Sequence, residues 1–518
     1  MRTLCSVVLA GCLVVLTGQN LVAQETPLTP LEQLGKALYF DHISTPINMA
    51  CATCHAPEAG FTGPKSRVNA VTAVYPGAVV KRFGNRKPPS AAYAAFSPLF
   101  DYDPVDGLFF GGNFWDGRAT GWNLGNPAAD QALGPFLNPV EQNMPSREAV
   151  LEQVVLSLYT DLWEAVWGTP VDPTNPADYD RIGLAIAAFE MSAEVNPFSS
   201  KFDAYLAGDA ALSPVEAEGL ALFEGKAMCS ACHVSEVGPN GEPPLFTDFT
   251  YDNLGTPRNP DNPFYRMDEV NLDDGSPINP DGAAWVDPGL AGFIAQLATS
   301  DAWRSLPYVT PTLSAMPSGD LSAMVGENLG KHKVPTLRNV DLRINQNFVK
   351  AYMHNGVFKT LRQVVHFYNT RDVGTWPPPE VADNVNVDEL GNLALTDAEE
   401  IALVAFMKTL SDGYDPAMAR MATAEPVLAT TNAVAFNLAG PNPFNPATRL
   451  MISLPAAADL TVSVYAITGQ WIGTLAQGWH EAGTHRIEFN GASLASGIYL
   501  VRLETVASVK TLKLTLLR

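Results

Sequence analysis

The pentapeptide CATCH at residues 51–55 recurs as CSACH at residues 229–233, so the chain carries two C-x-x-C-H motifs about 178 residues apart. Two thiols at this spacing can each form a thioether with one vinyl group of a haem, and the histidine that follows places an imidazole next to the iron. Two disulfides or one four-cysteine zinc site would also use the four thiols, but neither explains a histidine directly after both pairs. The motifs therefore predict two covalently attached haem c groups. The predicted haem-binding residues are Cys51, Cys54, His55, Cys229, Cys232 and His233.

The other two cysteines, Cys5 and Cys12, lie in an N-terminal segment that is typical of a signal peptide. A basic start is followed by a mostly apolar run over residues 4–16 and by small residues before position 24. The apolar run is shorter than the roughly 20 residues of a membrane-spanning helix, so it predicts a cleaved signal over residues 1–23 rather than an anchor. The sequence LAGC at residues 9–12 resembles a lipobox, which leaves lipoprotein processing open.

Charge and composition exclude some partners. The 518 residues include 32 basic and 54 acidic side chains, and the formal net charge of -22 opposes binding to nucleic acid and to anionic lipid. Charged residues make up only 17% of the chain, while 40 glycines and 41 prolines favour a loop-rich soluble protein. We expect no nucleic-acid partner and no membrane span.

Hydrophobic periodicity predicts a mainly α fold in which two cytochrome c-like haem lobes with long loops precede a small all-β, Ig-like sandwich. The expected domains are a signal peptide at 1–23, haem domains at 24–205 and 206–414, a linker at 415–431 and the sandwich at 432–518. Helical patterns cover Pro30–Tyr39, Ser146–Ala165, Arg181–Ser192, Ser213–Glu224, Leu361–Tyr368 and Thr396–Leu410. Residues 238–287 predict a long loop section, and the repeated C-x-x-C-H motif is the one internal repeat that we recognise.

Further motifs surround the two pentapeptides in a fixed order. Over about residues 30–412 the chain resembles the bacterial di-haem cytochrome c peroxidase and MauG family. The segments that carry the resemblance are LGKALYFD at 34–41, FWDGRA at 114–119, ALGP at 132–135, NPVE at 138–141, PLFTD at 244–248, KVPTLRNV at 333–340 and YMHNG at 352–356. This resemblance implies a di-haem enzyme that handles peroxide.

The resemblance implies roles for residues around the first haem. His55 would hold an iron with an open face, Glu141 matches the family's distal carboxylate, and Trp115 matches the tryptophan that mediates electron transfer between the haems. Family peroxidases that rest inactive carry a histidine on the other face of this iron, in the stretch between the first motif and the tryptophan. No histidine occurs between Ala56 and Cys232 here, so we expect a five-coordinate, high-spin iron that needs no reductive activation.

For the second haem, the resemblance implies His233 as the proximal ligand and Tyr368, fourteen residues after His354, as the sixth ligand. That position is usually methionine in the peroxidases and is tyrosine in MauG. A phenolate favours ferric and higher states, so Tyr368 should lower the potential of this haem relative to a methionine ligand. Met353 and His366 are alternative ligands.

Two features depart from the family pattern. MauG has a tryptophan two residues before its second cysteine pair, which passes oxidising equivalents to a protein substrate, whereas Ala227 stands here. The family also binds one calcium ion through an asparagine side chain and two backbone carbonyls. The carbonyls correspond to Val349 and Ala351, and the asparagine to Asn85 or, in an equally plausible alignment, to Lys87.

The C-terminal segment resembles a type IX secretion sorting domain with an Ig-type sandwich. The resemblance rests on GPNPFNP at 440–446, VY at 464–465, TG at 468–469 and SGIY at 496–499. It implies passage through the periplasm to the cell surface or the medium, with the type IX machinery as a partner. A plain interaction module is the alternative.

Together these features predict an exported di-haem peroxidase that reduces hydrogen peroxide to water. Electrons would come from a small donor protein such as a cytochrome c or a cupredoxin. A MauG-like oxidase that modifies another protein is the first alternative, supported by Tyr368 and opposed by Ala227. A di-haem electron carrier with two capped irons is the second.

Overall fold

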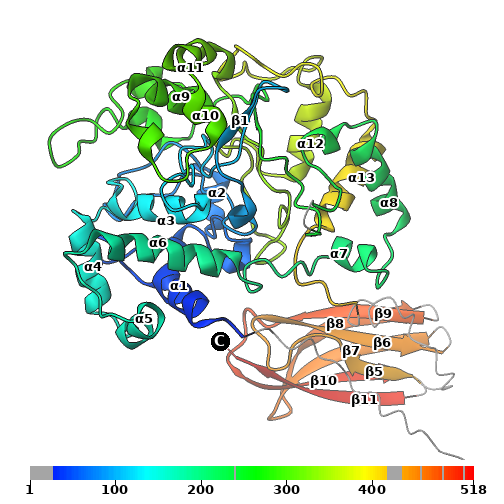
Figure 1. Ribbon diagram of the computed structural model, residues 1–518. Coiled ribbons are helices and arrows are strands. Elements are labelled where there is room, and N and C mark those ends of the chain that lie inside the picture. The colour runs from blue at the N-terminus through cyan, green and yellow to red at the C-terminus, as the bar shows by residue number, and fades with distance from the viewer. Residues whose placement is uncertain are drawn as a thin grey trace, which may run out of the picture. The chain divides into compact units, whose positions relative to one another are not determined.

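The computed structural model describes residues 27–238, 241–416, 434–455, 458–480, 483–505 and 508–517. The chain divides into two compact units between Pro416 and Ala417 (Figure 1). Both C-x-x-C-H motifs belong to the first unit. The predicted signal peptide and most of the predicted linker lie outside the described residues.

The first unit is mainly helical. Its helices are α1 Pro30–Phe40, α2 Ser66–Ala70, α3 Pro127–Leu137, α4 Arg147–Val155, α5 Thr160–Trp167, α6 Pro176–Met191, α7 Lys201–Leu206, α8 Pro214–Glu224, α9 Leu290–Thr299, α10 Pro311–Ala315, α11 Ser318–Met324, α12 Leu361–Thr370 and α13 Asp397–Lys408. Two small antiparallel pairs accompany them, β1 Asp101–Asp103 with β2 Leu108–Phe110, and β3 Tyr251–Asp252 with β4 His332–Lys333. Long loops connect these elements, as the composition predicted.

The helices that precede the two motifs share a repeat that the sequence analysis did not recognise. The segment TPLEQLGKALYF forms α1 with its N-cap, and SPVEAEGLALFE forms α8 with its N-cap. In both, the first residue and the glutamate three positions later form a capping box around a proline at the first helical position. The two haem motifs therefore follow helices that start in the same way.

A glycine at the same place in each repeat lets a second helix pack closely. A Cβ atom added to Gly35 of α1 would lie 1.8 Å from the Ala185 carbonyl oxygen of α6. A Cβ atom added to Gly219 of α8 would lie 2.0 Å from the Ala402 carbonyl oxygen of α13. Each motif is thus preceded by a helix whose backbone closely approaches a later helix, α6 in the first lobe and α13 in the second.

Arg338 joins the two lobes. Its fully buried guanidinium forms two 2.9 Å hydrogen bonds to Asp203 of α7, and its Nε donates to the Pro244 carbonyl at 2.7 Å. The same guanidinium lies over the rings of Tyr93 and Phe198, at 5.1 and 4.6 Å from their centroids. A paired charge that also stacks on aromatic rings fixes the first lobe against the second.

The predicted helices form, although α6 begins at Pro176 rather than Arg181, and α2, α3 and α7 were not predicted. The predicted helix over Ser146–Ala165 is two helices, because the chain leaves α4 after Val155 so that the Tyr159 hydroxyl can donate to Asp41 at 2.7 Å. The sequence analysis also predicted no helix between residues 287 and 361, where α9, α10 and α11 form. These helices surround a separate apolar cluster with Phe100 and Trp122. The apolar faces of α9, α10 and α11 pack on Phe100 and Trp122, which are distant in the sequence, so local periodicity alone did not predict these helices.

The second unit is a β-sandwich. Its strands are β5 Ala435–Leu438, β6 Ala447–Leu454, β7 Ala458–Ala466, β8 Trp471–His480, β9 Gly483–Asn490, β10 Gly497–Thr505 and β11 Ser508–Leu516. They form two antiparallel sheets in the orders β5-β6-β9 and β11-β10-β7-β8. Alternate residues of β10, namely Tyr499, Val501 and Leu503, point into the core between the sheets. The predicted fold class is confirmed.

No helix within the described ranges is both long and apolar enough to cross a membrane.

We expect Gly219→Ala to lower the free energy of unfolding by about 1–3 kcal/mol, since a backbone carbonyl cannot move aside for the new methyl group as a flexible side chain could. Chemical denaturation of the holoprotein measures this change. Gly319→Ala in α11 is the control, because a Cβ atom there meets nothing within 4 Å. Equal stability of the two variants would contradict the close helix packing.

Candidate functional site

Both C-x-x-C-H motifs adopt the same local structure. Each begins with a short 3₁₀ turn, Cys51–Thr53 in the first lobe and Cys229–Ala231 in the second. The His55 Nδ1 lies 3.3 Å from the Phe61 carbonyl oxygen, and the His233 Nδ1 lies 2.9 Å from the Phe246 carbonyl oxygen. A carbonyl can only accept, so Nδ1 carries the proton in each ring and the Nε2 lone pair is free for a metal.

The motif residues fit a haem iron. Burial lowers the pKa of both His55 and His233 to about 4, so both imidazoles are neutral, as metal ligation requires. The four thiols are not joined in disulfides. Each pair lines a cavity together with its own histidine, and we call these the His55 cavity and the His233 cavity. A ring system with two vinyl arms could meet both thiols and the imidazole in each cavity.

The two cavities share one wall. The residues that line both cavities are Lys87, Pro89, Ser90, Trp115, Lys333, Val334, Pro335 and Thr336. We call this set the shared wall. Trp115 is only 8% exposed, and its indole N–H donates to the Lys87 carbonyl at 2.9 Å. Its own carbonyl accepts from the Lys333 amide at 2.9 Å. The predicted electron-mediating tryptophan is therefore held between the two predicted haem sites.

Glu141 follows α3 in a tight turn and lines the His55 cavity. Burial raises the pKa of this carboxyl, while the guanidinium of Arg118 and a hydrogen bond from Asn138 oppose the rise. Arg118 itself lines the cavity and lies over the Phe114 ring at 4.0 Å. Among the described residues that line this cavity, His55 is the only histidine. A carboxyl group of raised pKa facing the cavity is suited to proton transfer there.

Tyr368 and Met353 both line the His233 cavity, whereas His366 does not. Tyr368 lies on α12, and burial next to Cys232 and Cys229 raises the pKa of its hydroxyl. His366 is about half exposed, and its Nδ1 lies 2.9 Å from Glu400. The structure therefore places Tyr368 and Met353 at the His233 cavity and His366 away from it.

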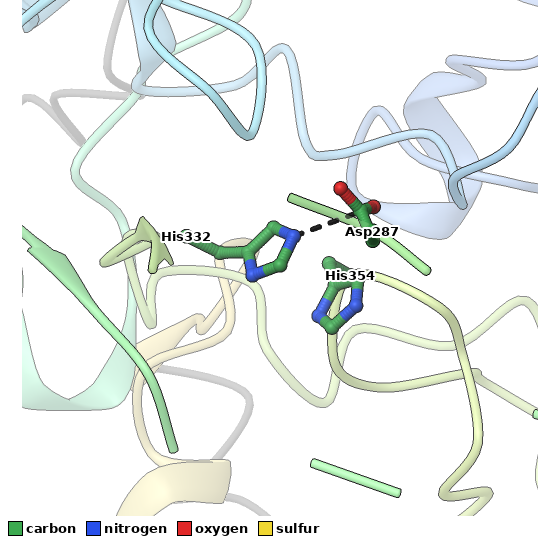
Figure 2. Close-up of side chains that lie close together, drawn as sticks. All are labelled: Asp287, His332 and His354. Carbon is green, nitrogen blue, oxygen red and sulfur yellow. Dashed lines mark ion pairs between the residues drawn. The ribbon is translucent and has the colours of Figure 1, made fainter. Parts of the chain in front are cut away.

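A cluster of titratable side chains, Asp287, His332 and His354, adjoins the shared wall (Figure 2). The His332 Nε2 lies 3.3 Å from Asp287, and the rings of His332 and His354 stack with centroids 3.6 Å apart. The His354 ring in turn lies 6.4 Å from Trp115. The two carboxylate oxygens of Asp287 accept from Arg86 at 2.6 and 2.7 Å.

This cluster is an ion-pair network rather than an open metal site. The ligand atoms of Asp287, His332 and His354 lie close enough to hold an ion. However, Arg86 already occupies both oxygens of Asp287, and the two imidazole rings are parallel within 8°, so their nitrogen lone pairs do not converge. Sequence reasoning missed this cluster because its members come from strand β4 and from two loops that are separate in the chain.

Glu190 is a second residue that sequence reasoning missed. It is buried in α6 and lines the His55 cavity, where burial raises the pKa of its carboxyl to about 8. A glutamate among buried apolar positions of α6 is the signal that could have found it.

The residues predicted for calcium do not assemble into an oxygen-rich site. Asn85 lines the His55 cavity, whereas Ala351 lines the His233 cavity. The Val349 carbonyl accepts from the Asn69 side chain at 3.0 Å. Between the two predicted carbonyls lies Lys350, whose buried ammonium group would repel a divalent cation. The geometry therefore does not fit the predicted ion, and no step of the mechanism is assigned to it.

Ala227, at the position of the MauG tryptophan, is 2% exposed. Its carbonyl accepts weakly from the Cys229 thiol, with oxygen and sulfur 3.4 Å apart. A buried methyl group cannot present an oxidisable ring to a partner protein.

Comparison with known proteins agrees with this geometry. Residues 29–211 match the family model described as di-haem cytochrome c peroxidase, and residues 441–516 match that of a secretion system C-terminal sorting domain. The chain is 33% identical over 402 residues to the methylamine utilization protein MauG of Paracoccus denitrificans, a match that covers 74% of this chain and 90% of MauG. It is 28% identical to the cytochrome-c peroxidase IdrP1 of Denitromonas iodatirespirans, covering 75% and 84% of the two chains.

A solved structure is also similar. The diheme peroxidase BthA from Burkholderia thailandensis superposes with a TM-score of 0.58 at 31% sequence identity, covering 76% of this chain and 88% of that one.

We expect Asp287→Asn to lower the free energy of unfolding by about 2–4 kcal/mol at pH 7, because the buried Arg86 would lose one of its two carboxylate partners and keep only Asp116. Burial alone would raise the pKa of Asp287. The charges of Arg86 and His332 outweigh that effect and hold the pKa well below its usual range. The ion pair therefore stabilises the fold above about pH 4, the unfolded value, and this contribution is lost as the pH falls further. Urea denaturation of the variant and of the unaltered protein, at pH 7 and below about pH 4, measures this loss of stability.

Asp301→Asn is the matched control, because Asp301 forms its ion pair with Arg304 at the surface. We expect it to cost less than about 1 kcal/mol. If the two variants lost the same stability, the buried network would not contribute as described.

Proposed function

Because the chain belongs to the di-haem cytochrome c peroxidase and MauG family, we propose that it reduces hydrogen peroxide to water with electrons from an external donor. The strongest support comes from the residues that line the His55 cavity. Glu141 is one of them, and His55 is the only histidine among the described residues there. An iron held by His55 would then have one face open to peroxide. The family carries two haems, which when bound supply the redox iron chemistry at His55 and His233.

Covalent attachment is part of the proposal. Cys51 and Cys54 would each form a thioether to the first haem, and Cys229 and Cys232 to the second. The neutral imidazoles of His55 and His233 would hold the iron through Nε2, because their Nδ1–H groups donate to the carbonyls of Phe61 and Phe246. That hydrogen bond orients each ring and makes the ligand more basic.

Glu141 would move the proton that peroxide cleavage requires. As a carboxylate it accepts the proton from the oxygen of peroxide that approaches the iron, and it then donates that proton to the departing oxygen, which leaves as water. Burial raises its pKa toward the working pH, so loss and return of the proton both remain accessible. Arg118, which lines the same cavity, limits that rise and leaves the carboxylate form populated.

Trp115 would connect the two sites. Its ring lines both cavities, and its N–H donates to a backbone carbonyl rather than to a base. Oxidation of the ring therefore leaves its proton in place, so that an electron can pass without proton transfer.

Tyr368 would be a second protein ligand, beside His233, for the haem of the His233 cavity. The raised pKa of its buried hydroxyl means that the phenolate forms only against a strong positive partner, which a ferric iron provides. A phenolate ligand stabilises the oxidised haem, so this site can hold an oxidising equivalent.

A MauG-like oxidation of a protein substrate is the second candidate function. Tyr368 and the uncapped His55 site favour it, as does the 33% identity to MauG. The buried Ala227 opposes it, because the surface aromatic ring expected for transfer to a partner is missing. A pure electron carrier would need two capped irons, which the His55 cavity does not favour.

The destination of the protein follows from its second unit, a sorting domain of a secretion system, which indicates export to the surface or the medium. We propose that a cleaved signal first directs the chain to the periplasm and that the type IX machinery then recognises residues 441–516. A small cytochrome c or cupredoxin is the proposed electron donor.

We expect Glu141→Gln to slow peroxide turnover by about 10²-fold or more, the scale of general acid–base catalysis. Stopped-flow mixing of the ferric protein with peroxide measures the rate. In the unaltered protein the rate should rise with pH through the raised pKa of Glu141, as the carboxylate forms, and the variant should lose this dependence. Glu148→Gln, at an exposed residue of α4, is the control. Equal rates for Glu141→Gln and the unaltered protein would support the electron carrier.

Electron paramagnetic resonance tests the ligand assignment. We expect one high-spin and one low-spin ferric haem as isolated, both responding to peroxide without prior reduction. Tyr368→Phe should remove the low-spin signal, because phenylalanine offers no ligand atom, and Tyr368→Met should keep it while raising the potential of that haem. His366→Ala should change neither. A low-spin signal that survives Tyr368→Phe would assign the ligand to Met353 instead.

A further inference from the structure

We propose that the protein takes no calcium between its two haem cavities, and that the ammonium groups of Lys87 and Lys350 supply the positive charge there. The family resemblance implies a calcium ion bound by the carbonyls of residues 349 and 351 and by a side chain at position 85 or 87. Lys350 lies between the two carbonyls, and Lys87 occupies one of the two candidate side-chain positions.

Lys350 is held as a bound cation would be. It is only 5% exposed, and its Nζ donates to the carbonyl oxygens of Ala59, Asn339 and Leu342 at 3.1, 2.6 and 3.1 Å. These three acceptors come from both lobes, so one ammonium group with three donors satisfies an oxygen cage between them. Among the described residues it forms no ion pair with a carboxylate.

Lys87 supplies the second charge. It lines both cavities, its Nζ donates to the Pro88 carbonyl at 3.0 Å, and the ammonium group lies 5.7 Å from the centre of the Trp115 ring. Its backbone is fixed as well, because its N–H donates to the His354 carbonyl at 2.9 Å and its carbonyl accepts from Trp115. Where an asparagine could offer an oxygen ligand, this chain therefore offers a cation.

The two ammonium groups lie close enough to affect each other. Burial lowers the pKa of Lys350 to about 7 and that of Lys87 to about 8, so Lys87 carries the larger share of the charge at neutral pH, and its charge contributes to the lowering at Lys350. A divalent ion placed at the carbonyls beside Lys350 would meet both charges in a poorly solvated region. Calcium also needs six to eight oxygen ligands, whereas the Val349 carbonyl already accepts from the Asn69 side chain at 3.0 Å.

The first test measures metal content in the holoprotein, with two haems per chain verified by the pyridine haemochrome spectrum. After passage over a chelating resin, elemental analysis should find far less than one calcium per chain, and EGTA should leave the ferric spectra unchanged. Retention of one calcium per chain, or loss of the native spectra in EGTA, would overturn the proposal. Because neither readout depends on turnover, this result is independent of whether the protein proves to be a peroxidase.

The second test exchanges the side chain at position 87. Lys87→Asn restores an amide oxygen and removes a charge, so isothermal titration with calcium chloride should show binding that the unaltered protein lacks. Lys87→Arg, which keeps the charge, is the matched control and should bind none. Equal calcium binding by the two variants, or none by Lys87→Asn, refutes the assignment of Lys87.

A third variant tests the charge itself without adding a ligand. Lys87→Met should shift both haem potentials to more negative values, because loss of a nearby positive charge favours the ferric state. Lys36→Met, which removes a surface lysine paired with Glu194, should leave the potentials unchanged. Unchanged potentials in Lys87→Met would show that its ammonium group does not act on the haems and would refute the proposal.

Discussion

The hydrogen bond from the Trp115 indole to the Lys87 carbonyl fixes the centre of this protein. Trp115 also accepts from the Lys333 amide, so one aromatic residue ties the chain that follows the first haem motif to the chain that follows the second. Lys87 and Lys333, the two residues that Trp115 joins, line both cavities. The distance between the two proposed haem sites therefore cannot change without breaking the hydrogen bonds of Trp115. Rigid spacing of this kind is what electron transfer between two sites requires.

The region around that bond is unusually rich in buried charge. Arg86 pairs with Asp116 and Asp287 at 2.6 Å, and Asp287 continues to His332. The lysines follow a different principle, since their ammonium groups are satisfied by neutral carbonyls and keep an uncompensated charge near the cavities. Paired charges hold the loops in place, while unpaired ones set the local potential.

Sequence reasoning found what is encoded locally. The C-x-x-C-H motifs, the capped helices and the alternating strands each depend on residues a few positions apart, and the structure has them where the patterns predicted. Motif resemblance added Glu141 and Trp115, which the fold brings to the cavities. The cluster of Asp287, His332 and His354 could not be predicted, because loop closure alone brings its members together. The burial of Lys350 was equally hidden, since a lysine in a sequence is normally exposed.

The chain offers no histidine between Ala56 and Cys232 that could cap the iron proposed at His55. A capping histidine would need a flexible loop that brings it to the iron and takes it away, and the chain between the first motif and the shared wall carries none. That stretch instead supplies Arg86 and Lys87. Arg86 is fixed by its ion pair with Asp287, and Lys87 by the hydrogen bond from its Nζ to the Pro88 carbonyl and by the bond that its own carbonyl accepts from Trp115. A segment committed to holding charge between two haem sites is poorly suited to act as a movable cap. The lack of a cap and the presence of an internal cation are therefore two consequences of one rigid segment.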